Sequence, residues 1–351
     1  MLMGNLDPTE STNSKADAVT KGDRIWEFPT KGVAHNIIKI TDVPIPMRDG
    51  LDLAANVYRP EEPGEYPVII GFTPYGKDFY WGDAEKIFGE DWAGTGVGYE
   101  PWNPPVADSC VFEAEDHNFW VPHGYVVIAI DARDHWKSPG DDELQLGDDG
   151  LGYIGRDLYD AIEWAGQQDW SNGNVGLSGV SALSRHQYYA AVRDPPHLEA
   201  ICPWEGTPGE FLEHGGIGPQ TSPLEVIFET FDVPSNAVWS TPEETEPEEF
   251  EPRLPDEWFK DITQPALICG TWSNHGFPGR YDFRAFRNIS SEHKWLYNHG
   301  REKWACFYET EAQAFRKMFF DHFLKNSDDR IQDVPPVRME VRDTMRDWTV
   351  R

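Results

Sequence analysis

The residue of this sequence best suited to nucleophilic chemistry is a serine. Ser181 lies in the segment GNVGLSGVSALS, residues 173–184, whose pattern predicts a strand that runs into a helix. A serine on such a sharp turn can act as a nucleophile, and the turn needs small residues because neighbouring backbone approaches it closely. Gly179 fits the first half of the G-x-S-x-G pattern, but Leu183 stands at the second glycine position. Ser181 is therefore either a nucleophile or an ordinary serine that caps the next helix.

A serine nucleophile needs a general base, and His299 stands in a suitable place. In α/β-hydrolase chains the order is serine, then acid, then histidine. His299 follows a predicted strand, in a loop from which a base can reach Ser181. A histidine of a surface loop is the alternative. The acid is expected after the predicted strand at residues 266–271, but the loop there, WSNHGF, contains no carboxylate.

The elements that must position these side chains follow from the apolar pattern. A clear helical pattern covers residues 154–168, and the turn at residues 47–50 predicts an antiparallel hairpin. Strand and helix patterns alternate, which predicts an α/β fold with a mostly parallel central sheet and helices on both faces. The runs that predict strands are residues 37–45, 51–58, 66–72, 125–132, 174–179, 198–203, 266–271 and 294–297.

Three regions can be separated along the chain. Residues 1–33 are polar and lack periodicity, which predicts a mobile N-terminal tail. Residues 34–206 and 262–351 form the predicted α/β core. Residues 207–261 break the alternation with Gly, Pro and Glu, which predicts a cap insertion with a solvated acidic loop.

Composition narrows the classes of partner. The 351 residues include 61 acidic and 30 basic side chains, for a formal charge of −31. Such a charge opposes binding to nucleic acid or to anionic membranes. The four cysteines are isolated, which favours buried free thiols, and no motif predicts a metal or another cofactor. With no signal peptide or long apolar run recognisable in the sequence, we expect a cytoplasmic protein without a membrane anchor.

Seven short motifs, in order over about 300 residues, resemble the Xaa-Pro dipeptidyl-peptidase-like hydrolases, the CocE/NonD group. The resemblance covers roughly residue 36 to the end of the sequence. It implies an α/β-hydrolase fold with a helical cap and a serine nucleophile. The motifs are MRDG at 47–50, TPYGK at 73–77, PHGY at 122–125, DAR at 131–133, KSPG at 137–140, YDAIEW at 159–164 and PPHL at 195–198.

The resemblance assigns roles to individual residues. Ser181 looks like the nucleophile and His299 like the base. Tyr75 looks like the oxyanion tyrosine of the family, acting with the backbone N–H of Ala182. A turn tyrosine packed beside Pro74 is the structural alternative for Tyr75.

The sequence also departs from the family pattern. Asn274 stands where the family commonly carries Asp, and an amide cannot stabilise an imidazolium by charge. Either the activity is weak, or another carboxylate such as Asp282 substitutes, or the protein does not hydrolyse. The family generally continues after residues 337–342 into a jelly-roll domain, for which the sequence to Arg351 leaves no room.

We therefore expect a serine hydrolase that cleaves ester or amide bonds through an acyl-enzyme. Its substrate would be a small ester, an amide or a short peptide, including peptides with proline in the second position. A catalytically weak or inactive binding protein on the same fold is the alternative. The sequence leaves open whether the chain forms a homo-oligomer.

Overall fold

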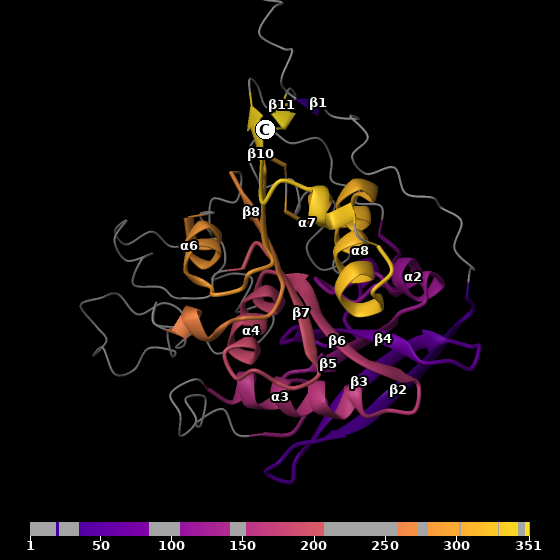
Figure 1. Ribbon diagram of the computed structural model, residues 1–351. Coiled ribbons are helices and arrows are strands. Elements are labelled where there is room, and N and C mark those ends of the chain that lie inside the picture. The colour runs from indigo at the N-terminus through magenta and orange to yellow at the C-terminus, as the bar shows by residue number, and fades with distance from the viewer. Residues whose placement is uncertain are drawn as a thin grey trace, which may run out of the picture.

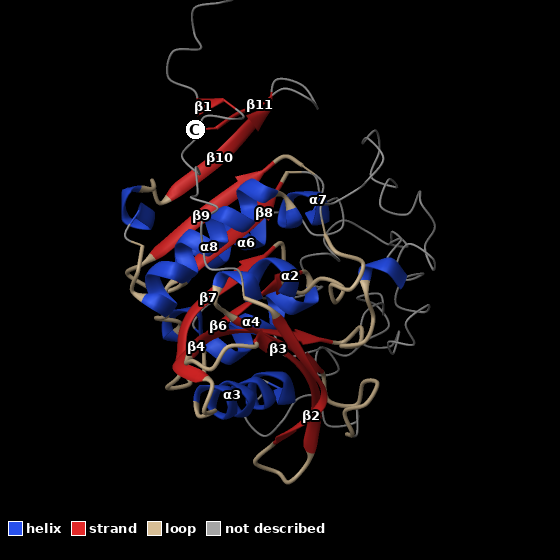
Figure 2. Cartoon of the chain, turned by 90° about the vertical axis from the view of Figure 1, so that its right-hand side faces the viewer, coloured by secondary structure: helices blue, strands red, loops and turns tan. Residues whose placement is uncertain are grey.

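A single mixed β-sheet forms the centre of the protein. The computed structural model describes residues 19–20, 35–83, 106–140, 152–206, 258–272, 280–301, 303–328, 330–342 and 348–350. The described strands lie in the order β1-β11-β10-β9-β8-β7-β6-β4-β5-β3-β2, which can be followed from β2 at the lower end of Figure 2 to β10 and β11 at the upper end. Their bounds are β1 Val19–Thr20, β2 Ile37–Pro46, β3 Asp52–Pro60, β4 Tyr66–Thr73, β5 Val126–Asp131, β6 Ser171–Val180, β7 Leu198–Trp204, β8 Ala266–Thr271, β9 Lys294–His299, β10 Val337–Arg342 and β11 Trp348–Val350.

The strand directions agree with the sequence pattern. β2 and β3 pair antiparallel through the turn at residues 47–50, where Gly50 has a φ of +89°. β3 then pairs antiparallel with β5, whereas the strands from β5 through β4 to β10 pair in parallel. The predicted mixed, mostly parallel sheet is confirmed. In such a sheet the carboxyl ends of the parallel strands meet at one edge, which is where a site is expected.

Helices cover both faces of the sheet (Figure 1). α3, α4 and α6 pack on one face, and α2, α7 and α8 lie on the other. α3 forms where the pattern predicts it because Leu158, Ala161, Ile162 and Ala165 recur at helical spacing and are all buried. The helix bounds are α2 His117–Trp120, α3 Gly152–Gly166, α4 Ala182–Ala191, α6 Arg280–Asn288, α7 Lys303–Tyr308 and α8 Thr310–Lys325.

The far edge of the sheet was not predicted. β10 extends the sheet in parallel beside β9, and β11 turns back antiparallel on β10. β1, within the segment predicted to be a mobile tail, pairs with β11. The pairings of β10 with β9 and of β1 with β11 join residues distant in sequence, so no local pattern reveals them.

The structure also bears on the predicted cap, the cysteines and the expected absence of membrane-spanning helices. Of the predicted cap at residues 207–261, the structure describes only residues 258–261, so the predicted domain boundaries stay a prediction. All four cysteines are buried and free, as expected: Cys110, Cys202, Cys269 and Cys306. Among the described helices, none is both long and apolar enough to cross a membrane.

Candidate active site

Ser181 lies on the turn between β6 and α4, at the carboxyl edge of the sheet. Its backbone has φ 60° and ψ −115°, a conformation that non-glycine residues rarely adopt. The turn is held from both sides, because Ser181 N–H donates to the Trp204 carbonyl at 3.0 Å and the Ser181 carbonyl accepts from Arg185 N–H at 3.0 Å. The Ser181 side chain makes no helix-capping hydrogen bond. The geometry is that of a nucleophile elbow and does not fit an ordinary capping serine.

Glycines around the turn make room for it. Gly179 has a φ of +147°, and a Cβ placed there would lie 2.6 Å from Cβ of Leu183. A Cβ on Gly206 would lie 2.4 Å from the Ser181 carbonyl oxygen. Leu183, which replaces the second glycine of the pattern, is buried, and its Cδ2 lies 3.4 Å from the Cβ position of Gly71. In the G-x-S-x-G pattern, the second glycine leaves room for the turn. Here Leu183 stands at that position, and the room is provided by the two glycines that face Leu183, Gly71 and Gly179.

Tyr75 reaches the same place from the end of β4. Its side chain is buried, and its hydroxyl is in hydrogen-bond contact with Ser181. Burial, reinforced by the nearby Glu113 carboxylate, raises the pKa of Tyr75 well above its ordinary value. The phenol therefore keeps its proton and can donate it. The backbone N–H of Ala182 is at the first residue of α4, where amides lack an intrahelical acceptor.

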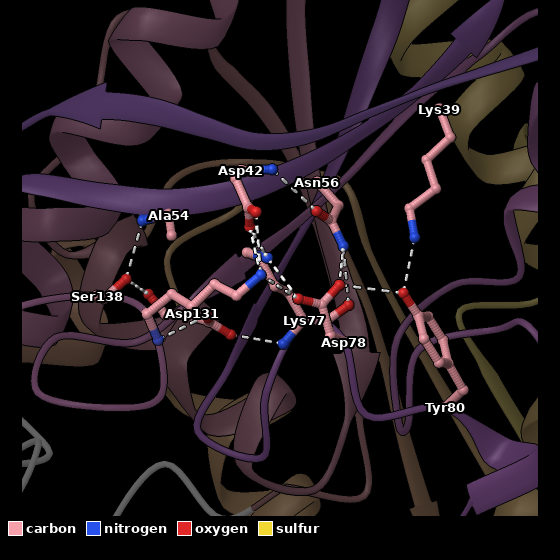
Figure 3. A network of polar contacts seen from close by, with 10 residues as sticks. Lys39, Asp42, Ala54, Asn56, Lys77, Asp78, Tyr80, Asp131 and Ser138 are labelled. Carbon is pink, nitrogen blue, oxygen red and sulfur yellow. Dashed lines mark hydrogen bonds and ion pairs between the residues drawn. The ribbon is translucent and has the colours of Figure 1, made fainter.

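A polar network holds the loop that carries Tyr75 (Figure 3). The Lys77 ammonium is fully buried and pairs with Asp42 at 2.6 Å and with Asp78 at 2.7 Å. The Lys77 N–H donates to Asp131 at 2.5 Å, and Asn56 donates to the Lys77 carbonyl at 3.1 Å. The loop is thus fixed against both β3 and the end of β5.

Glu113 lies beside Tyr75 and is almost entirely buried. Trp304 Nε1–H donates to its Oε1 at 2.9 Å, and its carbonyl accepts from Val180 N–H. The Glu113 carboxyl group also interacts with the Tyr75 hydroxyl. Burial raises the pKa of Glu113 to about 7, and the ammonium of Lys303 opposes this only in part. An acid that titrates near neutral pH therefore stands next to Tyr75.

His299 is the last residue of β9 and is fully buried. Its Nε2 lies 2.8 Å from Oε1 of Glu205, and its Nδ1 accepts the backbone N–H of Arg301 at 3.1 Å. In the neutral ring, Nδ1 can accept this N–H, so the single ring proton lies on Nε2 and is donated to Glu205. The structure therefore places the two predicted residues Ser181 and His299 at the same sheet edge, with both ring nitrogens engaged by other partners. One of these contacts has to open before the ring can accept a proton from Ser181.

Glu205 is the functional candidate that sequence reasoning missed. It follows β7 directly, and it adopts a left-handed backbone with a φ of +50°. Its N–H donates to the Cys269 carbonyl at 2.7 Å. The available signal was a carboxylate directly after a predicted strand of the parallel sheet, at the edge where active sites form.

The pKa of His299 reflects its surroundings. Burial lowers it, but the neighbouring Cys306 sulfur and the Glu205 carboxylate outweigh burial and raise it to about 10. The neutral ring, which can act as a base, is then the main form only at alkaline pH.

The acid position predicted from the sequence is only partly described. Asn274 lies outside the described residues. Asp282, the suggested substitute, is buried on α6, and its Oδ1 has no hydrogen-bond partner among the residues that the structure describes. Burial and the nearby Glu205 raise the pKa of Asp282 well above its ordinary value. In the described part of the chain, the carboxylate that contacts His299 is that of Glu205.

The sheet order, the helices on both faces and the strained serine between β6 and α4 define the α/β-hydrolase fold. Within that fold, the sequence family is also clear. The chain belongs to the X-Pro dipeptidyl-peptidase family (S15), whose model matches residues 49–281. The resemblance found in the sequence motifs and the predicted fold class are both confirmed.

Individual relatives agree with this assignment. Cocaine esterase from Rhodococcus sp. (strain MB1 Bresler) is 31% identical over 171 residues, which make up 49% of this chain and 24% of that protein. A CocE/NonD family hydrolase from Staphylococcus aureus superposes with a TM-score of 0.69 at 29% identity, over 90% of this chain and 55% of the other. An aminopeptidase from a marine sediment archaeon, Thaumarchaeota archaeon, shares the fold with a TM-score of 0.58 at 17% identity, over 89% of this chain and 58% of the other. The chain thus spans less than two thirds of the length of these relatives.

Proposed function

We propose that this protein is a serine hydrolase that cleaves ester or amide bonds through an acyl-enzyme. The observation that carries the proposal is the strained backbone of Ser181 on its strand-to-helix turn, with the hydroxyl in contact with Tyr75. Backbone strain of this kind costs about 1–3 kcal/mol, persists only where the surrounding structure fixes the residue, and is concentrated at active sites. Family membership supports the same class of reaction.

In the proposed reaction, Ser181 Oγ attacks the substrate carbonyl carbon and its proton passes to the neutral ring of His299. The resulting oxyanion accepts hydrogen bonds from the Tyr75 hydroxyl and the Ala182 N–H. His299 then gives the proton to the leaving alcohol or amine as the acyl-enzyme forms. His299 then accepts a proton from a water molecule that attacks the acyl carbon, and it passes this proton to Ser181 Oγ as the bond to the acyl group breaks and the acid product leaves. Short peptides with proline in the second position are the amide substrates to test first, because the matching family is named for them.

The second candidate is a binding protein that keeps the hydrolase fold without turnover. The observation that favours it is the engagement of both nitrogens of His299, by Glu205 and by Arg301. The presence of Asn274 at the usual acid position favours it as well.

Labelling with a fluorophosphonate distinguishes the two candidates. The probe phosphonylates activated serines, so wild-type protein should be labelled and Ser181→Ala should not. Turnover of p-nitrophenyl acetate is followed in the same samples from pH 6 to 10. It should be present in the wild type and lost, together with the labelling, in Ser181→Ala. Folded wild-type protein that takes up no label at any pH would contradict the hydrolase proposal and favour the binding protein.

A further inference from the structure

The Glu205–His299 pair combines two fully enclosed side chains. The Glu205 side chain is 1% exposed and that of His299 is 0% exposed. A buried carboxylate is strongly destabilising unless a partner compensates for its lost hydration, and the partner that Glu205 has is Nε2 of His299 at 2.8 Å. Within the described part of the chain, the other oxygen, Oε2, has no hydrogen-bond partner. The contact with His299 is therefore the main compensation for burying Glu205.

The backbone around Glu205 is shaped to present this side chain. Glu205 has a φ of +50°, which a non-glycine residue adopts at a cost in energy. The next residue must be glycine, because a Cβ on Gly206 would collide with the Ser181 carbonyl oxygen. The turn after β7 thus contacts the nucleophile through its backbone while its carboxylate holds His299 from β9.

We propose that Glu205 is the positioning carboxylate of His299, fixing the imidazole ring and the proton on Nε2. It would take the role that the family pattern gives to an aspartate at the position of Asn274. This inference rests on the proposed hydrolase function. It assigns the acid of that site to the residue that follows β7, whereas position 274 follows β8. Glu205 acts through His299 and is not itself placed on the reacting atoms.

Several charged or titratable groups besides Glu205 face the His299 ring. Cys306 contacts it from α7, Asp282 lies nearby on α6, and Glu340 approaches from β10. Glu340 is occupied by Tyr297, the Gly300 N–H and Arg301. Among the carboxylates that the structure describes, Glu205 is the one in direct hydrogen-bond contact with the ring.

The test uses Glu205→Gln, which keeps the shape and removes the charge. Two quantities are followed from pH 6 to 10: the rate constant for fluorophosphonate labelling of Ser181, and the protonation of His299 by NMR of protein labelled with ¹⁵N-histidine. In Glu205→Gln, we expect both titrations to move by at least about one pH unit toward acid, and the labelling rate at alkaline pH to fall by about tenfold or more. Glu205→Asp, which keeps the charge on a shorter side chain, should restore the wild-type pH profile in part, and it replaces Glu205→Gln if the amide variant fails to fold.

Two further variants serve as comparisons. Glu163→Gln removes the carboxylate of a partly exposed pair, with Glu163 2.9 Å from His197, and should leave both titrations of the active site unchanged. Asp282→Asn removes the competing buried carboxylate and should move them less than Glu205→Gln does.

The outcomes separate this inference from the proposed function. The inference is overturned if the NMR titration of His299 does not move in Glu205→Gln, if Asp282→Asn moves it more, or if Glu205→Gln is labelled faster than wild type at every pH. Wild-type protein that shows the Glu205-dependent titration but takes up no label would overturn the hydrolase function and the catalytic role of the pair, while leaving the pair itself established.

Discussion

At the residue scale, acid–base behaviour in this site is governed by burial. Glu113 is 2% exposed, and its pKa of about 7 exceeds the ordinary value of 4.5 because the charged form loses hydration. The hydroxyl of Tyr75 interacts with this carboxyl group and also with Ser181. When Glu113 ionises, its carboxylate becomes a stronger acceptor that competes for the Tyr75 proton.

The raised pKa of Glu113 predicts how stability depends on pH. The folded state binds this proton more tightly than the unfolded state, so stability should fall as pH rises from about 4.5 to about 7 and then stay lower. The difference in pKa corresponds to about 3 kcal/mol. Glu113→Gln should remove this contribution, so its unfolding free energy relative to wild type should rise over that pH range.

Urea denaturation of both proteins at pH 4.5, 5.5, 6.5 and 7.5 measures the effect. Wild type and Glu113→Gln with parallel pH dependence would show that Glu113 titrates normally.

At the element scale, α8 is joined to the sheet by a buried ion pair. Nε of Arg316 lies 2.9 Å from Oε1 of Glu115, and both side chains are almost completely enclosed. Glu115 also accepts Trp120 Nε1–H at 2.7 Å and the hydroxyl of Ser178 at 2.6 Å. Ser178 lies in β6, three residues before Ser181, so this network connects α8 to the strand that leads to Ser181.

Breaking this ion pair should be strongly destabilising. In Arg316→Met the Glu115 carboxylate stays buried without its cation, which should lower the unfolding free energy by about 3–5 kcal/mol. Adding Glu115→Gln removes the uncompensated charge, so the double variant should lose less than the sum of the two single variants. Urea denaturation of the four proteins gives the coupling energy. A single-variant loss below about 1 kcal/mol would mean that the pair contributes little.

At the scale of the whole molecule, the dominant feature is charge. The sequence carries 61 acidic against 30 basic residues, for a formal charge of −31. Like charges repel more strongly in the compact state than in the expanded unfolded chain, so the folded protein is destabilised at low ionic strength. Salt shortens the range of this repulsion, from about 10 Å at 0.1 M to about 3 Å at 1 M.

Salt should therefore stabilise the folded protein. We expect the melting temperature to rise by about 3 °C or more between 0.05 M and 0.5 M KCl, measured by differential scanning calorimetry at pH 7.5. Sucrose at matching osmolality separates charge screening from general solute exclusion. A melting temperature that stays level or falls over this range of KCl would show that the charges are spaced too widely to repel appreciably.

By itself the sequence determined the parts of this protein that depend on local pattern. The apolar runs marked the strands from β2 to β9, the helical spacing marked α3, and the segment around Gly179 marked the turn that carries Ser181. Each of these features is encoded within a few residues, because periodicity and steric freedom are local properties.

Tertiary structure alone decided which distant groups meet. The pairing of Glu205 with His299 joins residues 94 positions apart, and its strength comes from burial, which no local pattern reports. β10 became a strand because β9 offered it a parallel edge. Sequence pointed to Asn274 and Asp282 for the acid, whereas the folded sheet brought the end of β7 to His299, because neighbouring strands place their carboxyl ends side by side whatever their distance along the chain.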